Sequence, residues 1–171
     1  MLRVGLLSDT HGLIPEQIYR FFENCDEVWH AGDWGDVKTY EALSLFKPTK
    51  SVYGNIDNKE LRLLMPQDLF FIASDLKVVI THIGGYPGNY NGHAKKLISQ
   101  YQPDIFITGH SHILKIIRDK ENNLLHFNPG AAGIKGFHTL STAIRFTINK
   151  KIISDVEVWE GNLKKIVGQN T

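Results

Sequence analysis

The stretch MLRVGLLSDTHG, residues 1–12, combines a strand signal with two side chains that can bind a metal ion. Residues 3–8 form a short apolar run that ends in a polar residue, which is typical of a buried strand. Asp9 and His11 follow directly after it. Ligands of α/β proteins bind at the carboxyl ends of the strands. We therefore predict that this segment opens an α/β domain and places both side chains at the functional edge of its sheet.

Four later runs end in the same way, each followed by carboxylate, amide or imidazole side chains. The runs and the residues after them are 27–30 with Asp33, 49–53 with Asn55, 76–81 with His82, and 104–108 with His110 and His112. Because the ligand-binding edge of such a sheet gathers its strand ends, we expect all these side chains to converge. The glycines that precede Asp33, Asn55 and His110 predict close backbone approach at crowded strand ends.

The rest of the pattern predicts one domain over residues 1–160 and a polar tail over 161–171. Helical spacing of apolar residues covers 15–25, 36–46, 58–64 and 94–101. Strand signals at 68–74 and 76–81 flank a tight turn, and two hairpins are predicted, from 113–119 with 124–127 and from 142–148 with 152–159. Strands alternate with helices in the first half and dominate the second, which favours an α/β fold of two stacked sheets with helices outside.

The composition is that of a folded protein without a strong electrostatic signal. The 171 residues are 42% hydrophobic and 22% charged, which excludes a disordered chain. A net charge of +1 gives no strong signal for nucleic acid, and no apolar run approaches the roughly 20 residues of a membrane span. The single cysteine, Cys25, excludes an internal disulfide and is predicted to be an inert buried thiol. We expect a cytoplasmic protein, because reducing cytosol suits this cysteine usage and the first apolar stretch is too short for a secretory signal.

The candidate ligands form a nitrogen and oxygen donor set without sulfur. They are Asp9, His11, Asp33, Asn55, His82, His110 and His112. Such a set suits Mn²⁺, Fe, Co, Ni or Zn²⁺ better than Ca²⁺ or Mg²⁺, which prefer oxygen cages. Seven ligands are too many for one ion and suffice for two ions that share a bridging carboxylate, an arrangement that recurs in attack on phosphorus. Two such ions against two aspartates leave a positive site, which favours an anionic substrate.

The order of these motifs resembles that of the calcineurin-like metallophosphoesterases. The motifs are D-x-H at Asp9 and His11, G-D at Asp33, G-N-x-D at Asn55 and Asp57, T-H at His82, and G-H-S-H at His110 and His112. The resemblance covers residues 4–133. The short length and the N-P-G-A segment at 128–131 are most similar to the small bacterial single-domain phosphodiesterases, relatives of the retromer subunit with the same fold. The resemblance implies a four-layer α/β/β/α sandwich of two mixed β-sheets flanked by helices.

The resemblance also implies a role for each ligand. Asp9, His11 and His112 would hold one metal ion, Asn55, His82 and His110 would hold the other, and Asp33 would bridge both. The catalytic set, acting through the metal ions and the phosphate, would be Asp9, Asp33, Asn55, His82 and His110. The expected cofactors are two divalent transition-metal ions, with Mn²⁺ first and Ni, Fe, Co or Zn as alternatives. The expected reaction is attack of a metal-bound hydroxide on a small phosphodiester.

Three departures from the family pattern bear on the substrate. Phosphomonoesterase branches carry a histidine after the motif asparagine, where it protonates the leaving group, and this chain has Ile56. Ala131 stands where serine is usual, and the loop 83–92 is not of the usual histidine-rich form. A phosphodiester with a good leaving group needs no strong general acid, so Ile56 favours diester hydrolysis. A phosphomonoesterase and a non-catalytic protein-interaction scaffold remain as alternatives, and the oligomeric state stays open.

Three polar residues near the motifs have two interpretations each. His30 is predicted to be a packed strand histidine, with support of a ligand as the alternative. Asp57 either orients a ligand or caps the helix 58–64, and the sequence does not decide between them. His93 is predicted to be an exposed loop residue, with a substrate contact as the alternative.

The remaining motif and histidines belong to the second half of the chain. Asn128 is predicted first of all to form a turn. The family resemblance adds a role for it behind His112. His126 and His138 belong to or follow predicted strands, and we interpret both as structural.

Overall fold

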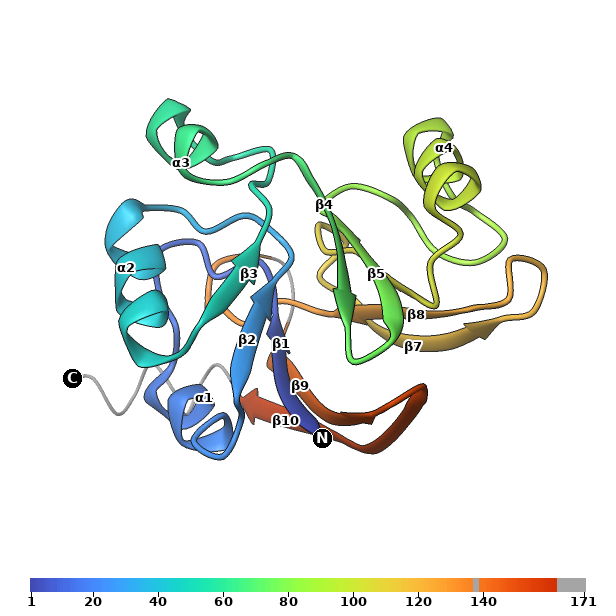
Figure 1. Cartoon of the computed structure of the whole chain (residues 1–171). Coiled ribbons are helices and arrows are strands. Elements are labelled where there is room, and N and C mark those ends of the chain that lie inside the picture. Colours follow the sequence, from blue (N-terminus) through green and yellow to red (C-terminus); the bar gives the residue numbers. More distant parts are fainter. Residues whose placement is uncertain (137–138, 163–171) are drawn as a thin grey trace.

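The computed structural model describes residues 1–136 and 139–162, which form two five-stranded sheets and four helices (Figure 1). The first sheet has the order β10–β9–β1–β2–β3, formed by Ile152–Asn162, Leu140–Asn149, Leu2–Leu7, Glu27–His30 and Thr49–Ser51. The second has the order β4–β5–β6–β8–β7, formed by Asp68–Ala73, Leu76–Thr81, Ile105–Ile107, Leu124–Pro129 and Leu114–Asp119. The helices are α1 (Glu16–Phe21), α2 (Val37–Phe46), α3 (Lys59–Leu64) and α4 (Gly92–Tyr101). His138 and residues 163–171 of the predicted tail lie outside the described residues.

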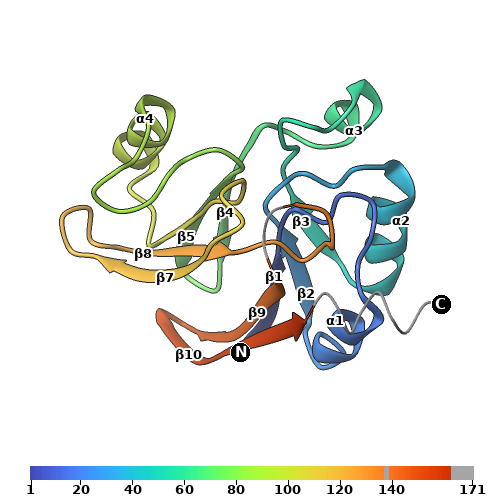
Figure 2. The same cartoon turned by 180° about the vertical axis from the view of Figure 1, so that it is seen from behind.

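Three hydrophobic clusters define the layers of the fold. The cluster between the sheets contains Val4 from β1 and Val78 from β5. A second cluster joins the first sheet to α1 and α2 through Ile18 and Leu43, and a third joins the second sheet to α4 through Leu97. The three clusters separate four layers. The arrangement of helices outside the two sheets can be followed in both views (Figures 1 and 2). The predicted α/β/β/α sandwich of two mixed sheets is confirmed.

Side chains along the central strands alternate between two of these interfaces. In β1, Leu6 faces the cluster between the sheets and Leu7 faces the helices. In β5, Ile80 faces the cluster between the sheets and Val79 faces α4. Because successive side chains of a strand point to opposite faces, a strand buried on both faces has a continuous apolar run. This burial explains why β1 and β5 are mostly apolar.

Parallel pairing brings the motif-bearing strand ends to one edge of each sheet. The strands β1, β2 and β3 are parallel in the first sheet, and β5, β6 and β8 are parallel in the second. Backbone hydrogen bonds join the loops that follow them: Asp9 N–H donates to the Gly32 carbonyl (2.9 Å), and Gly109 N–H donates to the His82 carbonyl (3.0 Å). Within each sheet the polar loops therefore lie side by side, and the contact of His82 Nδ1 with the Ala31 carbonyl (2.7 Å) joins the loops of the two sheets.

The largest differences from the predicted element ends lie at the ends of α1 and β10. The α-helix α1 ends at Phe21 rather than at residue 25, because the chain continues in short turns such as Cys25 N–H to Phe22 O (2.9 Å). The strand β10 continues past residue 159 because Asn162 still pairs with Leu140 of β9. Cys25 is buried as predicted, and burial raises the pKa of its thiol to about 11. Among the described helices, none is long and apolar enough to cross a membrane.

His126 on β8 is fully buried beneath α4, beside the rings of Tyr90 and Phe106. Its Nδ1 lies 3.4 Å from the Tyr90 hydroxyl, and its Nε2 has no hydrogen-bond partner among the described residues. Burial, together with the positive charge of Lys115, lowers the pKa of His126 to about 4. The folded protein therefore holds this imidazole neutral at pH values where an unfolded chain protonates it.

We expect His126 to make the fold sensitive to acid. Its stabilising contribution is complete above pH 6.5, the ordinary pKa, and is lost as the pH falls toward 4, because only the unfolded chain binds the proton in that window. The loss corresponds to about 3 kcal/mol of unfolding free energy. Urea unfolding at pH 7 and pH 4 measures it, and His126→Leu should lose much less stability than the wild type over this range. The exposed His93→Gln serves as control, and an unchanged acid loss in His126→Leu would contradict the assignment.

Candidate metal centre

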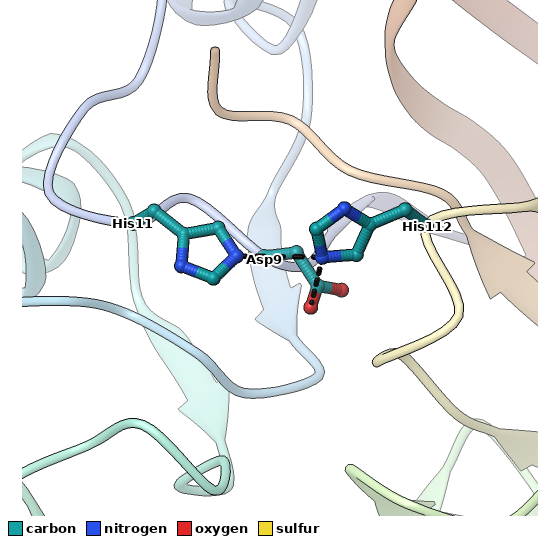
Figure 3. A group of neighbouring side chains, drawn as sticks. All are labelled: Asp9, His11 and His112. Carbon is teal, nitrogen blue, oxygen red and sulfur yellow. Dashed lines mark hydrogen bonds and ion pairs between the residues drawn. The ribbon is translucent and has the colours of Figure 1, made fainter. Parts of the chain in front are cut away.

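The first group of candidate ligands contains Asp9, His11 and His112, from the loops after β1 and β6. One donor atom of each lies within 4.8 Å of the others. His112 Nε2 is 3.2 Å from Asp9 Oδ1 and 3.4 Å from His11 Nε2. Figure 3 shows the two imidazole rings on either side of the aspartate. The fold thus brings together residues from opposite ends of the motif series.

The second group contains Asp33, His82 and His110, from the loops after β2, β5 and β6. His82 Nε2 lies 3.2 Å from Asp33 Oδ1 and 3.1 Å from Asn55 Oδ1, so the residue after β3 joins this group. The groups adjoin, because the backbone N–H of His110 donates to Asp9 Oδ2 (3.1 Å). The structure therefore places all seven predicted residues in two neighbouring groups built from both sheets.

Potential metal-ligand atoms converge at short distances in both groups. His82 Nδ1–H donates to the Ala31 carbonyl (2.7 Å), so its Nε2 is directed toward the oxygens of Asp33 and Asn55. Asp9 Oδ1 is buried and accepts no hydrogen bond from any residue that the structure describes. Its other oxygen, Oδ2, is held by the Ser8 hydroxyl at 2.5 Å. Converging lone pairs repel unless a proton or a cation lies among them, and this donor set fits a divalent metal ion in each group.

The charges of the site also favour a cation. Burial by itself raises the pKa of Asp33, but the hydrogen bond and charge of His82 and the N–H of Ile56 outweigh it and hold this pKa below its usual value. Burial by itself lowers the pKa of His82. The hydrogen bond to Asp33 and the charges of Asp9 and Asp33 outweigh this effect, so the pKa of His82 is raised above its usual value. Burial lowers the pKa of His11. Ionised carboxylates beside imidazoles form the kind of site from which a metal ion displaces protons when it binds.

Five of the seven candidate ligands have a left-handed backbone. The φ angles are 55° for Asp9, 49° for His11, 60° for Asp33, 66° for His110 and 57° for His112. This conformation is uncommon outside glycine, although Asp and His adopt it more often than most residues. Such residues persist where the surrounding structure holds them, and they concentrate at functional sites. The sharp turns after the strands direct these side chains into the site.

Two glycines allow the loops to approach as the sequence predicts. A Cβ atom at Gly54 would lie 2.0 Å from Asp33 Oδ1 and 2.3 Å from Asp33 N. A Cβ atom at Gly109 would lie 2.1 Å from Ser8 Oγ and 3.0 Å from Asp9 Oδ2. Heavy atoms cannot approach this closely without displacement. The absent side chains therefore leave the space that the two aspartates occupy.

His30 is packed in the core and also braces the loops that carry the aspartates. It is fully buried and stacks on the Trp34 ring at 3.5 Å. Its Nε2 lies 3.1 Å from the Thr10 hydroxyl, and its Nδ1 accepts the Gly32 N–H at 3.1 Å. Burial lowers its pKa well below the usual value. His30 is thus a packed strand histidine. It also supports the loops that carry the aspartates, through the Thr10 hydroxyl and the Gly32 backbone N–H.

The structure decides between the two interpretations of Asp57. Asn58 caps α3, since its Oδ1 accepts the Leu61 N–H at 3.0 Å. The buried Asp57 instead accepts the N–H groups of Gly54 (2.7 Å) and Gly35 (3.0 Å). It therefore ties the loop that carries Asn55 to the loop after Asp33.

Asn128 plays a similar part beneath the loop that carries His110 and His112. Its Nδ2 donates to the Gly109 carbonyl at 2.9 Å and to the Ser111 hydroxyl at 3.1 Å. Its Oδ1 accepts the Gly130 N–H at 3.0 Å, which forms the predicted turn. The side chain is buried, so it links the turn to the ligand loop.

Two residues near the site differ from what the sequence indicates. His93 is exposed as predicted, but it lies in the first turn of α4, because Asn91 caps that helix, and it pairs with Asp68 at 2.9 Å. Arg62 of α3 carries no motif signal, yet its Nη2 donates to the Asn55 carbonyl at 3.1 Å. The one signal in the sequence that could have indicated this contact is the position of Arg62, seven residues after Asn55 on the short helix α3.

Comparison with known proteins decides the family. The family model of the calcineurin-like phosphoesterase superfamily domain matches residues 2–151. The chain belongs to the calcineurin-like phosphoesterase superfamily. This calcineurin-like chain is also 29% identical over 133 residues to a probable metallophosphoesterase of Methanothermobacter thermautotrophicus, a match that covers 75% of the chain and 76% of the relative.

Solved structures share the fold of this calcineurin-like protein. Wild-type Vps29 of Entamoeba histolytica, in complex with Zn²⁺, has a TM-score of 0.72 and 18% identity, and the match covers 95% of this chain and 99% of Vps29. A novel archaeal phosphodiesterase has a TM-score of 0.66 and 21% identity, and the match covers 92% and 100%. At these identities the likeness concerns the fold. It shows that this chain shares the fold of these two proteins over nearly their full length.

Proposed function

We propose that this protein hydrolyses phosphodiesters with the help of two divalent metal ions. The observation that carries the proposal is the pair of adjoining ligand groups, in which buried Asp9 Oδ1 has no hydrogen-bond partner among the described residues and His82 Nε2 lies 3.1 Å from Asn55 Oδ1. Membership of a phosphoesterase superfamily supports the reaction type, and the archaeal neighbour is itself described as a phosphodiesterase. A small phosphodiester is the substrate that we propose.

The residues of each group have a proposed place around the ions. Asp9, His11 and His112 would hold one ion, Asn55, His82 and His110 the other, and Asp33 would contact both. We propose Mn²⁺ as the first choice for this nitrogen and oxygen set. When bound, the ions would supply Lewis acidity and lower the pKa of a water nucleophile. Ser8 and the Ala31 carbonyl orient Asp9 and His82, so the chain presents its donors in fixed positions.

Ile56 supports a diester as the substrate. Its backbone N–H donates to Asp33 Oδ1 at 3.1 Å, while its side chain is 48% exposed and has no proton to give. A poor leaving group therefore receives no general acid from this position, a contribution worth typically 10²–10⁴-fold. A monoester dianion would also be held by its ground-state charge, and uniform binding does not accelerate the chemical step.

The test compares ester classes on protein reconstituted with Mn²⁺. We expect kcat for bis(p-nitrophenyl) phosphate to exceed kcat for p-nitrophenyl phosphate, because the positive site holds the more highly charged monoester in its ground state as well as in its transition state. Ile56→His should raise activity on alkyl monoesters more than on nitrophenyl diesters. Ile72→His, at another exposed isoleucine on β4, is the matched control. A wild-type preference for alkyl monoesters would show that Ile56 does not select the substrate.

The scaffold alternative has support from the likeness to Vps29, which concerns the fold. The complete ligand set of this chain favours metal-dependent chemistry over a purely structural role. Protein that carries two ions per chain and turns over neither ester class would favour the scaffold.

A further inference from the structure

A hollow of about 220 Å³ opens beside the second ligand group. Its lining includes the candidate ligands Asn55 and His82, together with Tyr53, Arg62, Ile83 and His93. No residue of the lining is a carboxylate, and Arg62 is its one permanently charged side chain. A molecule whose phosphoryl group lies at the ligand groups can therefore extend into this hollow and meet a cation.

The Arg62 guanidinium is held in place from three sides. Its Nε–H donates to the Asp57 carbonyl at 2.8 Å, and its Nη2 donates to the Asn55 carbonyl at 3.1 Å. Its centre lies 4.9 Å from the centre of the Tyr53 ring. These contacts use two of the five N–H donors of an arginine. The guanidinium is thus oriented, and donors remain for a further partner.

The guanidinium of Arg62 forms no ion pair with any residue that the structure describes. The described residues include every Asp and Glu of the sequence. The nearby Asp68 pairs with His93, and the buried Asp57 accepts backbone N–H groups. A planar guanidinium with free donors matches the two oxygens of a carboxylate or phosphate. Because its backbone contacts already restrict the side chain, little rotamer freedom remains to be lost on binding.

We propose that Arg62 binds a second oxyanion of the substrate, a carboxylate or a phosphate on the organic group attached to the reacting phosphoryl group. The inference rests on the proposed function for the position of the phosphoryl group. It narrows the substrate class to phosphodiesters that carry a further negative charge. The competing explanation is that Arg62 only braces the loop 54–58 through the two carbonyls.

Equilibrium binding of matched phosphonates separates these explanations. The probes are propylphosphonate, 3-phosphonopropionate and propane-1,3-bisphosphonate, titrated calorimetrically into Mn²⁺-loaded protein. We expect the wild type to bind the two probes with a second oxyanion about 10- to 100-fold more tightly than propylphosphonate, as charge-assisted hydrogen bonds allow. The stronger of the two probes identifies carboxylate or phosphate as the preferred group.

Variants of Arg62 decide whether it is the source of this selectivity. In Arg62→Gln the three affinities should become equal, and Arg62→Lys, which keeps the charge without the fork, should retain part of the difference. Arg20→Gln, at an exposed arginine of α1, should keep the wild-type ratio. If Arg62→Gln weakens the binding of all three probes equally, Arg62 only braces the loop 54–58. The proposal would be overturned if the wild type bound all three probes with similar affinity, or if Arg62→Gln kept the wild-type difference between them.

The same samples keep the two proposals apart. Hydrolysis of bis(p-nitrophenyl) phosphate, which has no second oxyanion, tests the phosphodiesterase function alone. A protein that hydrolyses this ester without selecting among the phosphonates retains the proposed function and loses the role of Arg62. A protein that selects among the phosphonates without hydrolysing the ester retains the role of Arg62 and loses the catalytic proposal.

Discussion

Asp33→Asn should lower kcat/KM for bis(p-nitrophenyl) phosphate by about 10³-fold or more. In the wild type, the Ile56 N–H donates to Asp33 Oδ1 at 3.1 Å. The substitution preserves the shape of the side chain and keeps one oxygen that can accept this hydrogen bond. It removes the charge that faces His82 at 3.2 Å and that we propose to contact both ions. Metal ions supply several kcal/mol of transition-state stabilisation, and each 1.36 kcal/mol corresponds to a factor of ten.

Metal content and thermal stability give this prediction a second readout. Wild-type protein should bind up to two Mn²⁺ per chain, and an ion at about 100 times its dissociation constant should stabilise the fold by about 2.7 kcal/mol. Asp33→Asn should show lower occupancy and a smaller rise in Tm. Asp75→Asn makes the same chemical change in the exposed turn between β4 and β5 and should behave as wild type. Full occupancy and full activity in Asp33→Asn would refute the bridging role.

Gly54→Ala should disrupt the site without removing any ligand. The new Cβ atom would lie 2.0 Å from Asp33 Oδ1 and 2.3 Å from the Asp33 backbone nitrogen, so the loop after β3 must move away from the loop after β2. Overpacking of this kind costs about 1–3 kcal/mol of unfolding free energy. A displacement of about 1 Å at a catalytic site can lower activity about 10²-fold, and we expect a loss of this size in kcat/KM.

Gly92→Ala is the matched control for this substitution. A Cβ atom at Gly92 would have no heavy atom within 4 Å, and the residue begins α4. It should keep the activity, the metal affinity and the urea midpoint of the wild type. Gly54→Ala with wild-type activity and stability would show that the two loops can separate without loss of the site.

Local sequence was sufficient to predict the elements that carry the site. The mostly apolar runs before Asp9 and His82 each correspond to a buried strand, because burial on both faces favours apolar sequence. The glycine before Asn55 indicated the close approach that the structure shows. The family resemblance supplied the four layers, and the three separate hydrophobic clusters confirm them.

Element ends and the surroundings of single polar residues were less predictable. The strand β10 extends to Asn162 because β9 offers a partner there, which the sequence of β10 does not record. Asp57 and Asn58 both have the chemistry of a helix cap. Only the positions of Gly35 and Gly54 show that Asp57 joins two loops while Asn58 caps α3.

The sequence by itself thus determined which residues stand at the strand ends, since that information lies in a few neighbouring positions. The tertiary structure decided how they group, because the contact of Asp9 with His112 spans 103 positions and depends on the stacking of two sheets. It also decided the orientation of His82, which a carbonyl of another strand end fixes, and the place of Arg62 beside the site. Contacts that a side chain makes with a backbone carbonyl or with a distant side chain leave no local pattern in the sequence, so they become visible only in the folded molecule.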